Sequence, residues 1–167
     1  VLFHGNNKSV TELERALRTG VGRIVVDSLE EIERLARCAA EAGVQQPVLV
    51  RITVGVEAHT HEYIATAHED QKFGFSLASG EASAAVEHIL RMPSLELVGI
   101  HSHIGSQIFD TSGFEVAAHR AVGFLGQVRD SHGLELLELN LGGGLGIAYV
   151  DGDDVRISRL RTRGGGL

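Results

Sequence analysis

The chain has 167 residues, enough for one domain, and its 43% hydrophobic and 22% charged residues, with only 2 prolines, exclude collagen and proline-rich disorder. The 15 Lys and Arg residues against 22 Asp and Glu residues give a net charge of −7, the wrong sign for a protein that neutralises nucleic-acid phosphates. No apolar run reaches the roughly 18 residues that span a bilayer, so we expect neither a nucleic-acid partner nor membrane association.

Short runs of β-branched residues alternate with amphipathic helical segments along the chain. Ser9 and Ser28 begin the first two predicted helices, and Glu12 and Glu31 stand three residues later, the spacing of a capping box. In chain order the predicted elements are a strand at 1–3, a helix at 9–18, a strand at 23–27, a helix at 29–43, strands at 47–52 and 73–77, a helix ending near 91, a strand at 95–103, a helix at 113–132 and a strand at 136–141.

This alternation predicts an α/β fold with a parallel sheet, either an open doubly wound sheet or a (β/α)8 barrel. Polar or glycine-rich motifs follow nearly every strand, and function spread over many strand ends favours the barrel. These motifs are HGNNKS at 4–9, DS at 27–28, HSHIGSQ at 101–107 and LGGGLG at 141–146. Eight strands close a barrel, so we expect a partial barrel of five or six strands with exposed sheet edges.

Two regions differ in character. Residues 1–150 carry the strand and helix pattern and form the predicted partial barrel domain, whereas residues 151–167 leave that pattern and are expected to be a divergent, disordered tail. The beginning of the chain at a strand suggests that it is a piece of a longer protein. The single cysteine, Cys38, lies in an apolar helical segment, where we expect it to be buried, and a lone thiol fits a reducing cytoplasm.

Three consecutive glycines, Gly142, Gly143 and Gly144, follow the last predicted strand directly. Without side chains their N–H groups can converge on an anion, and phosphate is the usual occupant of such a turn; a simple tight turn is the alternative. No Lys-Ser or Lys-Thr pair follows as in a Walker motif, and Tyr149 stands where a dinucleotide-binding fingerprint needs its third glycine. The glycines therefore favour a phosphate site outside those two nucleotide-binding classes.

His101 and His103 stand two residues apart at a predicted strand end, so both side chains are expected on one side of the sheet. A His-x-His pair can bind Zn²⁺ in a barrel hydrolase, with His59 and His61 as a second pair. Alternatively, one imidazole stacks on an aromatic cofactor while Ser106 and the backbone of the preceding glycine hold its phosphate. A structural role in a loop is the third possibility. The nearby glycine triplet favours the phosphate cofactor over the metal.

Four segments together resemble a known family: FHGNNKS, VLVRITVGVEAHTHEYIATAHEDQKFGFS, GIHSHIGSQIFD and LNLGGGLGIAY. They are similar to the fold type III pyridoxal-phosphate decarboxylases, specifically the diaminopimelate decarboxylases of actinobacterial type, over residues 1–150. The resemblance implies an alanine-racemase-like barrel followed by a β domain, pyridoxal 5'-phosphate as cofactor and a homodimer in the full-length enzyme. It also implies decarboxylation of meso-diaminopimelate to L-lysine in the cytoplasm.

The resemblance also implies roles for individual residues. His103 stacks on the cofactor ring, Ser106 lies by its phosphate, and Gly142, Gly143 and Gly144 form the phosphate-binding turn. Three further residues match family motifs near the barrel mouth without an assigned role, and two histidines match the actinobacterial insertion. The first group is Asn7, Arg51 and Lys72, and the second is His59 and His61.

The chain departs from the family pattern at the catalytic residues. The Schiff-base lysine of the family lies upstream of HGNNKS, and both lysines of this chain, Lys8 and Lys72, belong to other motifs. The Glu-Pro-Gly segment and the catalytic Cys-Glu pair are absent too, and Cys38 is not that cysteine. We therefore assign no catalytic residue and expect this fragment to be inactive alone. The alternatives are a related decarboxylase acting on ornithine, arginine or carboxynorspermidine, and the metal-dependent barrel hydrolase.

Overall fold

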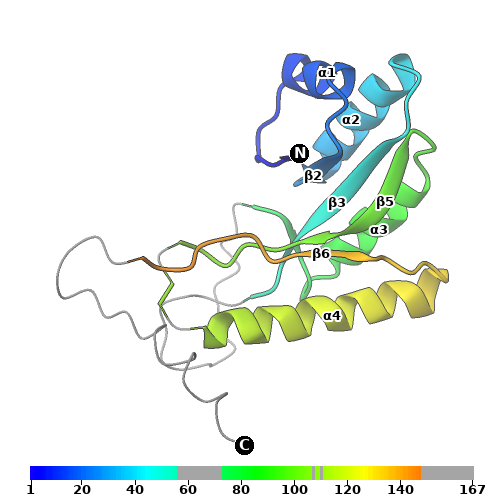
Figure 1. Ribbon diagram of the computed structural model, residues 1–167. Helices are drawn as coiled ribbons and strands as arrows, with labels where there is room; N and C mark the ends of the chain where they lie inside the picture. The colour runs from blue at the N-terminus through cyan, green and yellow to red at the C-terminus, as the bar shows by residue number, and fades with distance from the viewer. Residues whose placement is uncertain (56–72, 107, 110, 148–167) are drawn as a thin grey trace, which may run out of the picture.

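The computed structural model of the chain describes residues 1–55, 73–106, 108–109 and 111–147. Helices and strands alternate as the sequence predicts (Figure 1). The elements are β1 (Leu2–Phe3), α1 (Val10–Arg18), β2 (Arg23–Val26), α2 (Leu29–Glu41), β3 (Gln46–Thr53), β4 (Phe75–Ser76), α3 (Glu81–Leu90), β5 (Leu95–His101), α4 (Ser112–His132) and β6 (Glu138–Asn140).

The strands form one parallel sheet in the order β1-β2-β3-β5-β6, and β4 pairs with the carboxyl end of β3. The helices follow the curve of this sheet from α1 and α2 beside β2 to α4 beside β6 (Figure 1). Six parallel strands with helices between them are a half-barrel, which confirms the predicted partial barrel.

A side-chain contact across the sheet shows its curl directly. Arg23, at the start of β2, and Glu138, at the start of β6, form an ion pair in which Nε donates to Oε1 at 2.8 Å and to Oε2 at 2.9 Å, and Nη2 also donates to Oε1. Two strands, β3 and β5, lie between them in the sheet order. Because side chains stand roughly perpendicular to a sheet, such a pair forms on the concave side of a curled sheet. This pair lies at the amino end of the strands.

The main core fills the space between the sheet and the helices. Alternate residues of the central strands, such as Ile24, Val26 and Val50, belong to this core, whereas Val25 and Leu49 are buried outside it, as the two-residue period of a strand requires. Each fully buried aliphatic side chain contributes about 1.5–3 kcal/mol relative to an exposed one. Cys38 is buried in the core, as predicted.

The element boundaries differ from the predicted ones mainly at strand ends. β5 ends at His101 instead of 103, and β6 covers three residues, Glu138–Asn140, instead of 136–141. Ser9 and Glu12 form the predicted capping box. Ser28 caps α2 by accepting from the Glu31 N–H, but the Glu31 carboxylate turns away to Lys8. The second capping box is therefore only half formed.

Several predicted features lie outside the described residues: the tail at 151–167 and the side chains of His59, His61 and Lys72. Among the helices that the structure describes, none combines the length and apolar character needed to cross a membrane.

Candidate functional site

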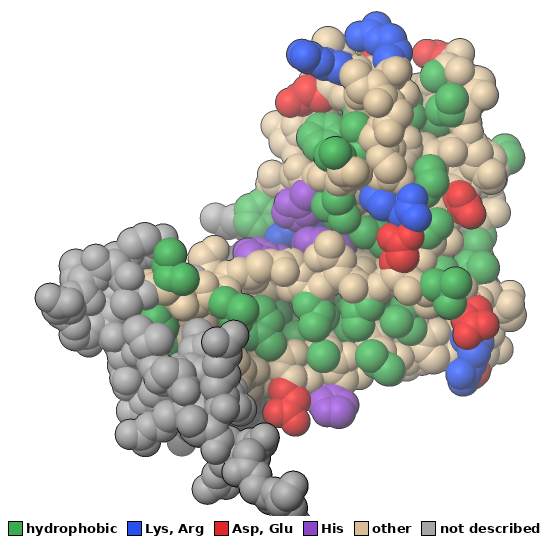
Figure 2. Space-filling view, in the orientation of Figure 1, with side chains coloured by type: hydrophobic (Ala, Val, Ile, Leu, Met, Phe, Trp, Pro, Cys, Tyr) green, Lys and Arg blue, Asp and Glu red, His purple; other side chains and the backbone are tan. Residues whose placement is uncertain are grey.

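The polar motifs meet at the carboxyl end of the sheet, as predicted. His4 follows β1 and His101 ends β5, and their rings lie 4.6 Å apart between centroids with a tilt of 36°. β1 and β5 are separated by β2 and β3, so the curl of the sheet brings these two histidines together. Figure 2 shows histidine side chains gathered on the surface between the part that carries α1 and α2 and the part that carries α4.

The surroundings of His4 and His101 disfavour the protonated form of both imidazoles. Burial, together with the positive potential of His4, Arg51 and His103, lowers the pKa of His101 to about 3. Burial and the charges of Arg51 and Lys8 also lower the pKa of His4. The Nδ1 atom of His101 is buried without a hydrogen-bond partner among the described residues. His101 is thus a neutral, largely enclosed ring under a more exposed one.

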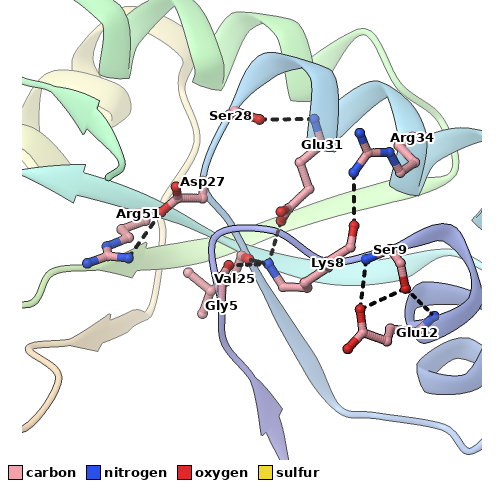
Figure 3. Close-up of polar contacts among 10 residues, drawn as sticks. All are labelled: Gly5, Lys8, Ser9, Glu12, Val25, Asp27, Ser28, Glu31, Arg34 and Arg51. Carbon is pink, nitrogen blue, oxygen red and sulfur yellow. Dashed lines mark hydrogen bonds and ion pairs between the residues drawn. The ribbon is translucent and has the colours of Figure 1, made fainter. Parts of the chain in front are cut away.

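Arg51 supplies the positive charge beside these rings. Its Nη1 donates to Oδ1 of Asp27 at 3.1 Å, and both side chains are mostly buried (Figure 3). The guanidinium also lies over the ring of Phe73, 5.1 Å from its centroid. Arg51 stands near the end of β3 and Asp27 follows β2, so both lie at the carboxyl end of the sheet where the sequence places Arg51.

The glycine triplet packs closely against the loop that follows β5. A Cβ atom on Gly142 would lie 2.8 Å from Nδ1 of His103 and from the carbonyl oxygen of Ser102. A Cβ atom on Gly144 would lie 1.9 Å from the carbonyl oxygen of Gly105. Both glycines also have a positive φ, 73° and 110°. These two positions therefore require glycine for backbone conformation and for the close approach of the two loops.

Gly143 has a different environment. A Cβ atom there would meet none of the described residues within 4 Å, so they leave the space above it open. The Gly142 N–H already donates to Oδ1 of Asn140 at 2.8 Å, whereas the N–H groups of Gly143 and Gly144 have no partner in the described part of the chain. Ser106 is exposed, and its Cα lies 3.4 Å from the position of a Gly144 Cβ. Two backbone N–H groups without a partner among the described residues and the exposed Ser106 thus belong to loops that are in contact.

This arrangement can bind an anion, because unpaired backbone N–H groups beside a hydroxyl donate to phosphate oxygens. His103, half-buried against Gly142, presents an imidazole next to the same loop. The predicted site residues are therefore neighbours in space.

Sequence reasoning missed His4 and Asp27 as members of this site. Both belong to motifs that directly follow predicted strands, HGNNKS and DS. Their place at a strand end is the feature of the sequence that could have indicated membership of the site.

Comparison with known proteins identifies the family. Residues 1–160 match the model of the family described as "Pyridoxal-dependent decarboxylase, pyridoxal binding domain". The chain belongs to this family. The cofactor of the pyridoxal-dependent decarboxylases is pyridoxal phosphate, as the motifs imply.

Relatives in this family include diaminopimelate decarboxylases. The protein of that name from Mycobacterium tuberculosis is 61% identical over 158 residues, which cover 92% of this chain and 35% of the relative. The Bacillus subtilis protein is 51% identical over 152 residues, covering 91% of this chain and 35% of the relative. The chain therefore spans about a third of the length of these relatives.

Solved structures of pyridoxal-dependent decarboxylases share the fold. The diaminopimelate decarboxylase of M. jannaschii superposes with a TM-score of 0.82 at 34% identity, covering 92% of this chain and 35% of that chain. A lysine decarboxylase from Selenomonas ruminantium gives 0.77 at 26% identity, covering 93% and 37%. Decarboxylases named for different substrates thus share this half-barrel.

The residues of this chain fit the phosphate and ring of pyridoxal phosphate. The open space at Gly143 and the free N–H groups beside it suit a phosphate, and the adjacent imidazole of His103 suits a flat ring. The family match favours pyridoxal phosphate over a metal ion as the cofactor. For the metal alternative, the described residues contain no group of three or more ligand side chains.

Proposed function

We propose that this chain forms the phosphate-holding part of the cofactor site of a diaminopimelate decarboxylase, which converts meso-diaminopimelate to L-lysine. The observation that carries the proposal is the space at Gly143, where a Cβ atom would meet none of the described residues within 4 Å, in a turn whose Gly143 and Gly144 N–H groups have no partner among those residues and which packs against the loop of the exposed Ser106. The names of the relatives at 61% and 51% identity support the substrate.

Each residue has a distinct task in this proposal. The N–H groups of Gly143 and Gly144 and the Ser106 hydroxyl donate to the phosphate, and the imidazole of His103 packs on the ring. Asn140 orients the turn through its hydrogen bond to the Gly142 N–H, 2.8 Å long. Arg51, paired with Asp27 at 3.1 Å, keeps positive charge beside the site and adds to the effect of burial in lowering the pKa of His4 and of His101.

When bound, pyridoxal phosphate supplies the electron sink that stabilises negative charge as carbon dioxide leaves. The described residues contribute binding and orientation, which fix the ring so that the bond to be broken keeps one geometry. The groups that move protons are proposed to lie in the two thirds of the relatives' length that this chain does not span. We further propose a cytoplasmic homodimer as the state of the full-length enzyme.

A hybrid protein tests the proposal. Residues 1–150 of this chain replace the matching segment of the Mycobacterium tuberculosis relative, to which the chain is 61% identical. We expect the hybrid to bind pyridoxal phosphate and to release carbon dioxide from meso-diaminopimelate, with L-lysine as product. The matched control is the same hybrid carrying Gly143→Val, which should lose cofactor affinity. A folded hybrid that binds no pyridoxal phosphate, or one that decarboxylates ornithine or arginine instead, would overturn the proposal.

A further inference from the structure

A buried lysine joins three elements next to the candidate site. Lys8 is 2% exposed, and its Nζ lies 2.6 Å from the Gly5 carbonyl oxygen, 2.7 Å from the Val25 carbonyl oxygen and 2.6 Å from Oε1 of Glu31 (Figure 3). These three contacts use all three donors of the ammonium group. Nη1 of Arg34 in turn donates to the Lys8 carbonyl oxygen at 2.8 Å. The loop after β1 is thus tied to the end of β2 and to the first turns of α2.

The ion pair between Lys8 and Glu31 has a large desolvation penalty. Both side chains are almost completely buried, at 2% and 3% exposed, so each charge has lost its hydration. Burial raises the pKa of Glu31, while the hydrogen bond from Lys8 opposes that rise. An apolar pair of similar size would fill the same space without this cost. What the charged pair adds is direction, because its three bonds are satisfied in only one placement of the loop.

The loop that Lys8 fixes has few other attachments. β1 pairs with β2 up to Phe3, and the capping box of α1 begins at Ser9. Apart from the ladder of β1 and β2, one hydrogen bond is found for residues 4–7 in the described part of the chain: the one from Lys8 Nζ to the Gly5 carbonyl oxygen. The side chains of His4, Asn6 and Asn7 are exposed. The placement of His4 therefore depends on Lys8.

We propose that Lys8 and Glu31 are positioning residues, whose buried ion pair holds the loop at residues 4–8 so that His4 covers His101. His101 is 4% exposed, with the ring of His4 centred 4.6 Å away. Release of the loop uncovers His101 and opens one wall of the site. The consequence for pyridoxal phosphate rests on the proposed function, but the placement of the two rings does not.

Hydrogen exchange at the C2 position of each histidine, measured by mass spectrometry on the 167-residue chain without cofactor, tests this proposal. His101 is the reporter, because the charges that act on it come from His4, Arg51 and His103 and not from Lys8. We expect Lys8→Met to speed exchange at His101 at least tenfold, while His132, exposed at the end of α4, stays within twofold. The matched control is Arg23→Met, which breaks the ion pair at the opposite end of the strands and should leave His101 within twofold.

Glu31→Gln provides a milder test if Lys8→Met fails to fold, because the amide keeps an acceptor for Lys8 and removes only the charge. It should speed exchange at His101 at least threefold. Unchanged exchange at His101 in a folded Lys8→Met variant, or in Glu31→Gln, overturns the proposal. Equal acceleration by Arg23→Met overturns it as well, because the effect would then be general destabilisation.

The affinity of the hybrid protein for pyridoxal phosphate separates this inference from the proposed function. If both are right, Lys8→Met weakens cofactor binding and Arg23→Met does not. If no form binds the cofactor while exchange at His101 still responds to Lys8→Met, the proposed function fails and the positioning role stands. If Lys8→Met binds the cofactor as tightly as the parent despite faster exchange, the role in the cofactor site is refuted.

Discussion

Replacing Gly143 with valine separates phosphate binding from fold stability. Its φ is not in the left-handed region, and a Cβ atom there would meet no residue within 4 Å in the part of the chain that the structure describes, so this part accepts a side chain. The valine would instead fill the space that the proposed phosphate occupies. Losing even one hydrogen bond to a charged group costs about 1.5–3 kcal/mol, which corresponds to a loss of at least tenfold in affinity.

The assay is a titration of the hybrid protein with pyridoxal phosphate, followed by absorbance, beside a thermal unfolding curve. Gly126→Ala is the matched control, because a Cβ atom on Gly126 would likewise meet no described residue within 4 Å outside its own helix, and Gly126 lies in α4, away from the site. His103→Ala should weaken binding less, since a stacking contact contributes about 0.5–1.5 kcal/mol. Unchanged affinity in Gly143→Val would refute the phosphate assignment. Loss of a bound metal in His103→Ala, with Gly143→Val nearly silent, would favour the metal site instead.

Three further predictions address the fold and the chain as it stands. Burial lowers the pKa of His101 from its ordinary value of 6.5 to about 3. Between pH 6.5 and pH 3, His101 therefore binds a proton in the unfolded chain but not in the folded chain. Stability should therefore fall as the pH drops from 6.5 towards 3, by at most about 1.4 kcal/mol per pH unit, and His101→Phe should flatten that slope in chemical unfolding at several pH values. Arg23→Met should lower the free energy of unfolding by about 0.5–1 kcal/mol, a loss that shrinks in high salt; a salt-independent loss would contradict a half-exposed ion pair. The 167-residue chain alone, with added pyridoxal phosphate, should release no carbon dioxide from meso-diaminopimelate. Release above the uncatalysed rate would show that this chain itself carries catalytic groups.

The sequence predicts the parts of this fold that depend on local chemistry. Helix starts follow from side chains three residues apart, and the capping box of Ser9 and Glu12 forms as expected. The same pattern at Ser28 and Glu31 is misleading, because a lysine 23 positions earlier in the chain takes the carboxylate. A local rule has no access to that competitor. The Glu31 carboxylate therefore accepts a hydrogen bond from the buried Lys8 instead of from the Ser28 N–H, which water can satisfy.

The candidate site shows the same limit. The glycine triplet and the histidines stand out in the sequence, but their separate tasks depend on distances between loops. Gly144 must be glycine because the Gly105 carbonyl lies where its side chain would be, whereas Gly143 faces open space. The pairing of His4 with His101 depends on the curl of the sheet, which strand patterns alone do not measure.

The curl itself comes from packing, and the ion pair between Arg23 and Glu138 is its consequence. A half-exposed pair contributes about 1 kcal/mol or less, too little to bend a sheet against the preference of its core. Gly99 in β5 is a stronger constraint, because a Cβ atom there would lie 2.0 Å from the carbonyl oxygen of Glu138. Any side chain at Gly99 would push β6 away from β5 and carry the glycine triplet with it. The ion pair between Arg23 and Glu138 and the position of the glycine triplet therefore both depend on the close approach of β5 and β6 at Gly99. Arg23→Met leaves that approach in place, so it should lower stability without moving the candidate site.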